Sequence, residues 1–453
     1  MNWEMIAERL NLMLEAGRRS QLRGALMMLS SVDIAQYIDL LDREKMLMVY
    51  RILPKDVAAE VFSYMDSDKQ RELIGLIGDA EINSLLSEMY LDDTIDFLEE
   101  LPAGVVRRVL MNADEQTRAL INQFLRYPEY SAGSIMTIEY CEFHIPMTVR
   151  QAMEEIRRTG LDKETIYTLY VIDEQRRLLG TVPLRSLILA KEETQVADIM
   201  LPNPVHVHTT DDQEIVADTV RKYDLMAIPV VDDEERLVGI VTADDVMDVI
   251  EEENTEDFEK MAALTPADDT YLKTPVITLV KNRMPWLLLL MFSAMFTGLI
   301  ITHYEGLLVT SGAIGVALTS CMPMLMGTGG NCGSQASTLT IRGLALGEIQ
   351  IKDVGRLLWK ECRVALIVGA ILAVLNVLRL VLLNGFTFGV AMSVGAALFL
   401  TVLLAKALGC VLPVLAKVFK LDPALMASPI LATIVDALSL VFLFAISSKV
   451  LHF

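Results

Sequence analysis

The chain has 453 residues, 53% of them hydrophobic, with a formal net charge of −21, an unusual combination for one compact soluble domain. Residues 1–280 carry 54 of the 60 acids and 27 of the 39 basic residues, a charge of −27, and the remainder carries +6. An acidic surface repels phosphate, so we expect no nucleic-acid partner. Such a surface also attracts multivalent cations, although composition alone favours a merely solvated surface.

Residues 1–130 have the amphipathic pattern of a stacked, superhelical array of helices, an all-α domain. One phrase recurs at an offset of 48 residues, as ILPKDVAAEVFSYM from Ile52 and ELPAGVVRRVLMNA from Glu100. Asp92 and Asp96 are four residues apart and share one helix face, which destabilises a helix unless a cation or a base joins them. Further acids surround this pair, so a solvated face explains it as well.

Residues 131–252 contain one pattern twice, over about 131–195 and 196–252. LYVIDEQRRLLGTVPLRSLI, from Leu169, recurs as IPVVDDEERLVGIVTADDVM, from Ile228. Each copy reads as helix, apolar strand, charged turn, apolar strand and helix. The repeat resembles a CBS pair, or Bateman module, an α/β fold. The resemblance implies that this part senses a small ligand, often an adenosine nucleotide.

The second copy alone retains the ribose-contacting pattern of CBS domains. Gly239, Thr242 and Asp245 match that pattern, whereas the first copy has Pro183 and Ser186 in the corresponding positions. The resemblance therefore implies at most one nucleotide site of this type, for ATP or a related compound.

Two histidines of the second copy, His206 and His208, are two residues apart and would share one face of a strand. A zinc site is one interpretation, and a pair of ordinary exposed histidines is the simpler one. The five cysteines show no CxxC spacing, so no disulfide framework and no cysteine zinc site is expected.

The sequence DDVMDVIEEENTEDFEKMAAL, from Asp244 to Leu264, is acidic and has apolar residues at helical spacing. It predicts a long helix that lies against another surface while it presents carboxylates. We expect this connecting helix to make up a separate element over residues 253–275.

Residues 276–453 are predicted to form a transmembrane domain of five helices. The expected spans are Met284–Thr302, Leu307–Met326 with an extension, Val364–Leu383, Phe388–Leu415 and Ala427–Ser447. Lys and Arg gather before the first span and after the second and fourth, which places those loops in the cytoplasm. No signal peptide is expected, because acids interrupt the apolar N-terminal pattern. We therefore expect a multi-pass protein of the cell (inner) membrane with both soluble domains cytoplasmic and a short C-terminus outside.

The sequence GTGGNCGSQAS, Gly327–Ser337, lies within 36 uncharged residues between Glu305 and Arg342. So many glycines in an apolar segment predict a helix that breaks inside the membrane, where irregular backbone must line a cavity or be buried in protein. Helix packing through small residues explains the glycines equally well. The amides of Asn331 and Gln335 favour the cavity.

Asp436 is the one charged residue in the middle of the last span. A carboxylate at that depth marks an ion path, a proton relay or a buried ion pair. Lys406 and Arg379 are expected near opposite ends of their own helices, which favours an ion path. One carboxylate per chain also favours a C2 dimer in which two copies face each other. Few acids and several amides fit hydrated Mg²⁺, and Co²⁺, Mn²⁺ or a proton would also accept this site.

The order of these parts, the GGNxGxQ phrase at Gly329–Gln335 and the SPxxxxxxD phrase ending in Asp436 resemble the MgtE family of magnesium channels. The resemblance implies a homodimer with Asp436, Asn331 and Gly330 in a Mg²⁺ pore at the dimer axis. It also implies closure by intracellular Mg²⁺ bound between the domains. The matching regulatory acids are Asp92, Asp96, Glu214, Asp224, Asp245, Asp248, Glu253, Glu256, Asp257 and Asp422.

The residues also fit a second class of protein. A secondary transporter of divalent cations such as Co²⁺ or Mn²⁺, coupled to protons or another gradient and regulated by its CBS pair, would use Asp436 as a proton relay. An enzyme is not expected, because the predicted spans contain no constellation of His or Cys residues.

Overall fold

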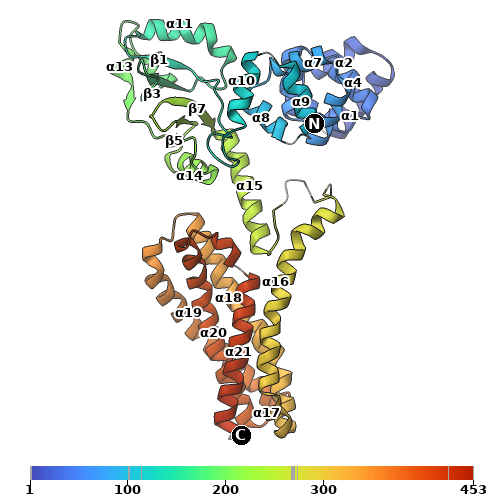
Figure 1. Cartoon of the computed structure of the whole chain (residues 1–453), viewed down its shortest axis with the longest axis vertical. Helices are drawn as coiled ribbons and strands as arrows, with labels where there is room; N and C mark the ends of the chain where they lie inside the picture. Colours follow the sequence, from blue (N-terminus) through green and yellow to red (C-terminus); the bar gives the residue numbers. More distant parts are fainter. Residues whose placement is uncertain are drawn as a thin grey trace. The chain divides into compact units, whose positions relative to one another are not determined.

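The computed structural model describes residues 3–99, 101, 103–113, 115–266, 271–272, 274–426 and 428–451 (Figure 1). The chain divides into two compact units: the first unit ends at Glu251, and the second unit begins at Glu252. The division falls within one helix, α15 (Ala243–Met261). The predicted connecting helix exists, but it starts and ends earlier than 253–275, because it continues from the second CBS copy and stops before Ala263, whose φ is +56°.

The first 124 residues form short helices. A helix in this array packs against the second helix after it, as in the contacts of α3 with α5 and of α5 with α7. The helices are α1 (Trp3–Glu15), α2 (Arg19–Leu26), α3 (Ser31–Asp39), α4 (Arg43–Tyr50), α5 (Lys55–Ser63), α6 (Ser67–Leu76), α7 (Asp79–Leu86), α8 (Leu91–Glu99), α9 (Ala103–Asn112) and α10 (Glu115–Phe124). Side-chain caps start several of them: Asp42 accepts a hydrogen bond from the amide of Lys45 at 3.0 Å. This is the predicted stacked array.

The two CBS copies form two small sheets of the same design (Figure 1). The strands are β1 (Glu142–His144), β2 (Thr168–Ile172), β3 (Leu178–Pro183) and β4 (Leu201–Pro202) in one sheet, and β5 (Val207–His208), β6 (Ala227–Val231) and β7 (Leu237–Thr242) in the other. In each copy a parallel pair precedes an antiparallel hairpin. The accompanying helices are α11 (Val149–Thr159), α12 (Leu184–Leu189), α13 (Val196–Ile199) and α14 (Gln213–Tyr223).

The two hairpin turns meet at the centre of the repeat. Arg177 and Arg236, equivalent positions in the two copies, form a β-bridge. The amide of Leu178 donates to the carbonyl of Glu235 at 3.1 Å, and the amide of Leu237 donates to the carbonyl of Arg176 at 2.9 Å. These reciprocal bonds fix the backbone of both turns.

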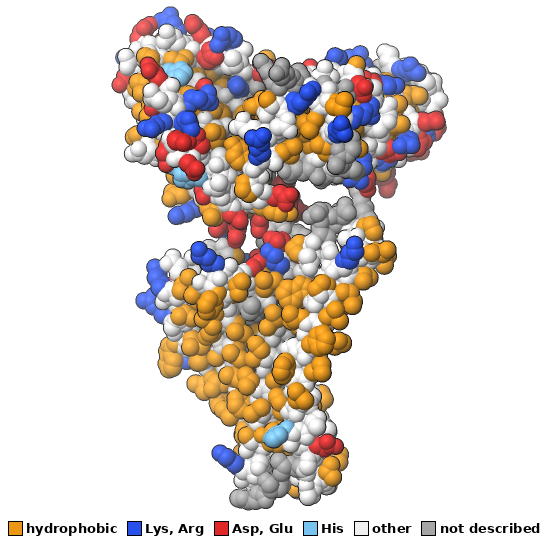
Figure 2. Space-filling model, viewed as in Figure 1, with side chains coloured by type: hydrophobic (Ala, Val, Ile, Leu, Met, Phe, Trp, Pro, Cys, Tyr) orange, Lys and Arg blue, Asp and Glu red, His pale blue; other side chains and the backbone are white. Residues whose placement is uncertain are grey.

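Within the residues that the structure describes, the second unit has five helices long and apolar enough to cross a membrane. They are α16 (Val276–His303), α18 (Ala313–Ala345), α19 (Val354–Leu382), α20 (Phe388–Val418) and α21 (Ser428–Leu451). A short helix, α17 (Glu305–Thr310), joins the first two. α20 packs against α18, α19 and α21. Hydrophobic side chains cover most of the visible face of these helices (Figure 2).

The predicted break in the second span is wrong, because α18 runs without interruption for 33 residues. Its glycines serve packing instead. A Cβ atom at Gly329 would lie 2.6 Å from Thr401 and 2.7 Å from Val435, and one at Gly409 would lie 2.4 Å from the carbonyl oxygen of Gly333. The backbone of α18 therefore stays helical through the glycines and approaches α20 and α21 at distances that only glycine allows.

Candidate functional site

Asp436 lies in the middle of α21, on a helix that packs against α18. Its neighbour Val435 contacts the position of Gly329. Ala432, one turn earlier on the same face, would lie 3.6 Å from a Cβ atom at Gly330. The side chain of Asp436 is half-buried, and no Lys or Arg in the described part of the chain pairs with it. A carboxylate without a base in this apolar unit is a candidate cation ligand.

A polar stripe runs along the exposed face of α18 beside this carboxylate. Gly327, Asn331, Gln335 and Thr338 are all exposed and recur every three to four residues, which places them on one helix face. Exposed amides are costly against lipid tails, so this stripe is typical of a face that meets water or another chain. Gly330 is buried and faces α21 instead.

A buried ion pair that the sequence analysis missed joins α19 to α20. The Nζ atom of Lys406 lies 3.2 Å from an Oε atom of Glu361, and Lys406 is only 6% exposed. Because Glu361 already neutralises Lys406, this lysine is not a counter-ion for Asp436. Lys406 gave a signal in the sequence, since it interrupts an apolar stretch, whereas Glu361 lies between Lys360 and Arg363 and gave none.

Six carboxylates gather in the first unit, contributed by four separate segments, and we call this group the first-unit cluster. Its members are Asp92, Asp93, Glu139, Glu164, Asp244 and Asp245. The amide of Glu164 donates to the carbonyl of Glu139 at 2.8 Å. One carboxylate oxygen of Glu164 is buried without a hydrogen-bond partner in the described structure. None of the six forms an ion pair with a described Lys or Arg.

Burial and mutual repulsion raise the pKa values of four members of this cluster. Burial, with repulsion from Asp245, raises the pKa of Asp93 to about 6 and that of Glu164 to about 7. Burial also raises the pKa of Asp92 well above its usual range, with Asp93 and Asp245 adding to the effect. The pKa of Asp245 is raised as well, chiefly by burial. Raised carboxyl pKa values mean that the ionised cluster is unfavourable unless a cation joins it.

A second group of acids lies where the end of α15 meets the segment before α21, wholly within the second unit. This second-unit cluster consists of Glu253, Glu256, Asp257 and Asp422. Lys260 lies among them, with its Nζ atom 2.7 Å from both Glu256 and Asp422. Burial, followed by repulsion from Asp422, raises the pKa of Asp257 to about 6. The ammonium group of Lys260 already bridges two of these carboxylates.

Among the other predicted regulatory acids, Asp248 lies beside the first-unit cluster, because it repels Asp245 and is repelled by Asp244. Asp96 is exposed, unlike Asp92 on the same helix. Glu214 and Asp224 are exposed at opposite ends of α14, about 15 Å apart at the rise of an α-helix, and Asp248 is exposed on α15. Sequence reasoning missed several members of the clusters, which are Asp93, Glu139, Glu164, Asp244 and Lys260. Asp93 and Asp244 adjoin predicted acids, whereas nothing in the sequence pointed to Glu164.

The predicted nucleotide residues lie together at the end of β7, but their contacts are with the protein. The hydroxyl of Thr242 donates to the carboxylate of Asp245, which belongs to the first-unit cluster. A Cβ atom at Gly239 would lie 2.6 Å from the sulfur of Met136 and 2.9 Å from the carbonyl of Thr137. Gly239 therefore admits a neighbouring strand.

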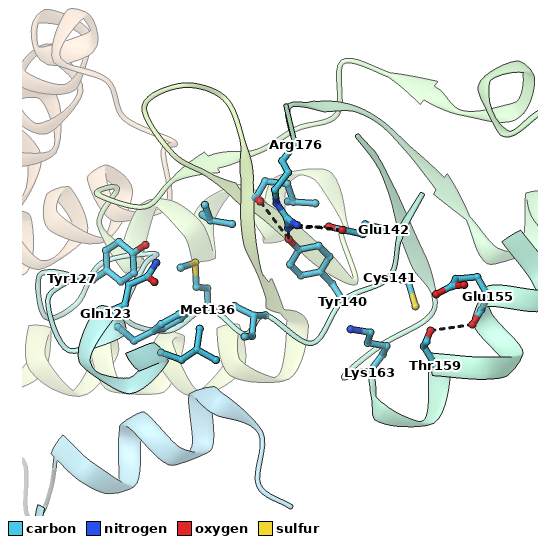
Figure 3. Close-up of a pocket in the computed structure, with 15 residues that line it drawn as sticks. Gln123, Tyr127, Met136, Tyr140, Cys141, Glu142, Glu155, Thr159, Lys163 and Arg176 are labelled. Carbon is cyan, nitrogen blue, oxygen red and sulfur yellow. Dashed lines mark hydrogen bonds and ion pairs between the residues drawn. The ribbon is translucent and has the colours of Figure 1, made fainter. Parts of the chain in front are cut away.

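A pocket of about 510 Å³ lies elsewhere in the first unit, between α10, α11 and the β-strands (Figure 3). Its polar lining includes Gln123, Lys163 and Arg176. Arg176 donates to the hydroxyl of Tyr140 at 2.7 Å and to Glu142 at 2.9 Å, as the dashed lines in Figure 3 show. None of the three predicted nucleotide residues lines this pocket.

The fold and these sites define a membrane protein with an acidic first unit, and comparison with known proteins gives its family. The profile described as "Divalent cation transporter" matches residues 322–446, "MgtE intracellular N domain" matches 29–130, and "CBS domain" matches 196–252. The magnesium transporter MgtE of Thermus thermophilus is 38% identical over 453 residues, which cover 99% of both chains. That of Bacillus subtilis is 32% identical over 93% of this chain and 94% of its own. The chain belongs to the MgtE family.

Two solved structures resemble the first part of the chain. The soluble part of a magnesium transporter has a TM-score of 0.53 and 31% identity, covering 56% of this chain and 99% of its own. The cytosolic domain of the Mg²⁺ channel MgtE in complex with ATP has a TM-score of 0.51 and 40% identity, covering 54% of this chain and 99% of its own. The fold of the helical array and the CBS pair is therefore the fold predicted.

Proposed function

We propose that this protein carries Mg²⁺ across the cell membrane through a path that includes Asp436. The half-buried carboxylate of Asp436, which has no Lys or Arg partner among the described residues, is the observation that carries the proposal, because Lys406 is already paired with Glu361. Mg²⁺ holds its water firmly and binds through one or two carboxylates with several waters retained. One carboxylate beside uncharged amides suits such a hydrated ion.

The exposed polar stripe of α18 supports a homodimeric pore. Asn331 and Gln335 face outward in a single chain, on a helix that belongs in a bilayer. A second copy related by a two-fold axis would cover this stripe with the same polar face and enclose water between the chains. We assign Asn331 and Gly330 to the walls of this path beside Asp436. The bias of basic residues supports a cytoplasmic first unit and an outer C-terminus.

The two acidic clusters support closure by cytoplasmic Mg²⁺. Binding of Mg²⁺ to the first-unit cluster would relieve the repulsion between α8 and the start of α15, and binding at the second-unit cluster would hold the end of α15 to Asp422. Mg²⁺ would thereby favour the compact arrangement, because a ligand shifts an equilibrium toward the state it binds better. Glu214, Asp224, Asp248 and Asp96 are exposed acids, and we propose that they add further regulatory contacts to Mg²⁺.

ATP is a proposed regulatory ligand of the CBS pair. Its support is the relative whose cytosolic domain was solved with ATP, together with the position of Thr242 and Asp245 at the end of β7. ATP phosphates beside Asp245 would need Mg²⁺ to offset their mutual repulsion. Binding of ATP should accordingly depend on Mg²⁺ and weaken in Asp245→Asn.

The test of the central proposal is Mg²⁺ flux into liposomes that contain the purified protein. Wild type should conduct, Asp436→Asn should fall to the level of empty liposomes, and flux should stop as Mg²⁺ rises on the side of the first unit. Glu305→Gln is the matched control, because it removes an exposed carboxylate of the second unit outside the spans.

Two outcomes would overturn this assignment. Flux unchanged in Asp436→Asn removes the carboxylate from the ion path. Flux that requires a proton gradient and acidifies the liposome interior would identify a coupled transporter of divalent cations in place of a channel.

A further inference from the structure

The two CBS copies differ at two pairs of equivalent positions beside their central turns. Phe143 pairs with Val171 in the first copy, and Val207 pairs with Val230 in the second. Val171 and Val230 are equivalent positions of the repeat, so Phe143 corresponds to Val207. Glu142 therefore corresponds to His206, and His144 to His208. Arg176 and Glu235 correspond in the same way, and both have a positive φ, +66° and +62°. The first copy therefore has an ion pair between Arg176 and Glu142 where the second copy has a carboxylate facing two imidazoles.

The geometry of the second copy brings three metal-ligating groups to one point. The Nε2 atom of His206 lies 3.3 Å from one oxygen of Glu235, and the Nε2 atom of His208 lies 3.6 Å from the other. One ligand atom from each of the three residues lies within 4.8 Å of the others. A tetrahedral ion with bonds of about 2.0–2.1 Å has edges of about 3.3 Å between its ligand atoms, close to the two nitrogen–oxygen distances, which run to different oxygens of Glu235.

The outer nitrogen of each imidazole faces an oxygen atom, at hydrogen-bond distance for His206 and at the longer distance of an ion-pair contact for His208. The Nδ1 atom of His206 lies 3.0 Å from the carbonyl oxygen of Pro204. The Nδ1 atom of His208 lies 3.7 Å from a carboxylate oxygen of Asp211, which also accepts a hydrogen bond from the backbone amide of His208 at 2.8 Å. A proton on each Nδ1 atom leaves the lone pair of Nε2 directed at Glu235, which is how metal-ligating histidines are held.

Lone pairs of two neutral imidazoles facing one carboxylate repel unless a positive charge lies between them. We propose that His206, His208 and Glu235 bind one Zn²⁺ or a similar transition-metal ion, with Asp211 orienting His208. Two imidazole nitrogens select Zn²⁺, Co²⁺ or Ni²⁺, whereas Mg²⁺ prefers oxygen ligands. The reciprocal backbone bonds at Leu178 and Leu237 hold the turn that carries Glu235, so the site is rigid on one side. The proposal does not rest on the ion path.

The experiment is a Zn²⁺ titration of the full-length protein in detergent, by calorimetry in saturating Mg²⁺ so that the acidic clusters are filled. Wild type should bind one Zn²⁺ per chain in addition to the Mg²⁺ that fills the acidic clusters. His206→Ala and His208→Ala should lose it, and Asp211→Asn should bind about 10- to 100-fold more weakly. His144→Ala is the matched control, because it removes the equivalent imidazole of the first copy and should bind as wild type does.

A second measurement identifies the ligands and does not depend on transport. Co²⁺ bound to wild type should give the visible absorption of a four-coordinate site, and Glu235→Gln, which preserves side-chain size, should weaken it. Circular dichroism of each variant checks that it is folded. Wild type without the additional Zn²⁺, or His206→Ala and His208→Ala folded and still binding it, would overturn the proposal.

Discussion

Glu361 and Asp436 are two carboxylates of the same apolar unit, and they have opposite surroundings. Glu361 lies 3.2 Å from the ammonium group of Lys406, while Asp436 has no basic partner in the described part of the chain. A charge that the protein neutralises itself is a structural element, whereas a charge left without a partner attracts an ion from outside. The position of the base, more than burial alone, separates the two roles.

The same contrast separates the two acidic clusters. The first-unit cluster has no described Lys or Arg paired with its members, and an oxygen of Glu164 is left without a partner in the described structure. The second-unit cluster contains Lys260, bonded to Glu256 and Asp422. We therefore expect the first cluster to depend on an external cation more strongly than the second.

The largest expected effect on stability comes from breaking the buried pair. Lys406→Met leaves Glu361 buried without a base, and loss of one partner of a buried pair costs about 3–5 kcal/mol. The free energy of unfolding, measured by denaturant titration in detergent, should fall by that amount. The double variant Glu361→Gln with Lys406→Met should recover most of it. Equal stability of Lys406→Met and wild type would mean that the pair is not formed.

An intermediate effect is expected from pH and Mg²⁺ at the first-unit cluster. The pKa values of Asp93 and Glu164, raised to about 6 and about 7, mean that folding takes up protons there. The stability that the protonated cluster contributes is present below about pH 4 and is lost as pH rises through 6 to 7. Mg²⁺ should replace the lost protons.

Thermal unfolding of the full chain measures this effect. The increase in Tm caused by Mg²⁺ should be larger at pH 8 than at pH 5, and Asp93→Asn should reduce it at pH 8. Glu88→Gln, an exposed acid outside both clusters, is the control. An increase that is the same at both pH values would mean that the cluster does not bind Mg²⁺.

The smallest expected effect comes from Lys260. Burial opposes its charge, but hydrogen bonds to Asp422 and Glu256 outweigh burial and raise its pKa. Because this ammonium group competes with Mg²⁺ for the same oxygens, Lys260→Met should lower the Mg²⁺ concentration at half-closure by roughly two- to fivefold, the equivalent of about 1 kcal/mol for a partly exposed pair. Lys420→Met, an exposed lysine of the same region, should leave the midpoint unchanged. A higher midpoint in Lys260→Met would contradict the competition.

Most of the architecture could be predicted, because its signals are local or periodic. Apolar length identified the five spans, and the repeat around Gly180 and Gly239 identified the CBS pair. The break in α18 was predicted wrongly because glycine allows both a bend and a close helix contact, and sequence does not state which neighbour approaches. Only the positions of Thr401 and Val435 against Gly329 decide between the two.

Candidate site residues could be predicted where the acids lie on one helix. They could not be predicted where folding brings together acids from segments distant in sequence. Asp92 and Asp436 were identified from spacing or depth, and Asp257 from family resemblance on a helix expected to present carboxylates; the structure gives each an environment that favours a cation or repels its own charge. Glu164 and Glu361 carry no local signal, since their importance comes from segments distant in sequence. Exposed acids such as Glu214 were assigned by family resemblance alone.

The most direct test compares the two membrane carboxylates in one assay. Mg²⁺ flux into liposomes would be measured for Asp436→Asn and for the double variant Glu361→Gln with Lys406→Met, at equal amounts of folded protein. The account predicts that flux disappears in Asp436→Asn and continues in the double variant. Flux retained in Asp436→Asn and lost in the double variant would contradict it, because the paired charges would then carry the ion.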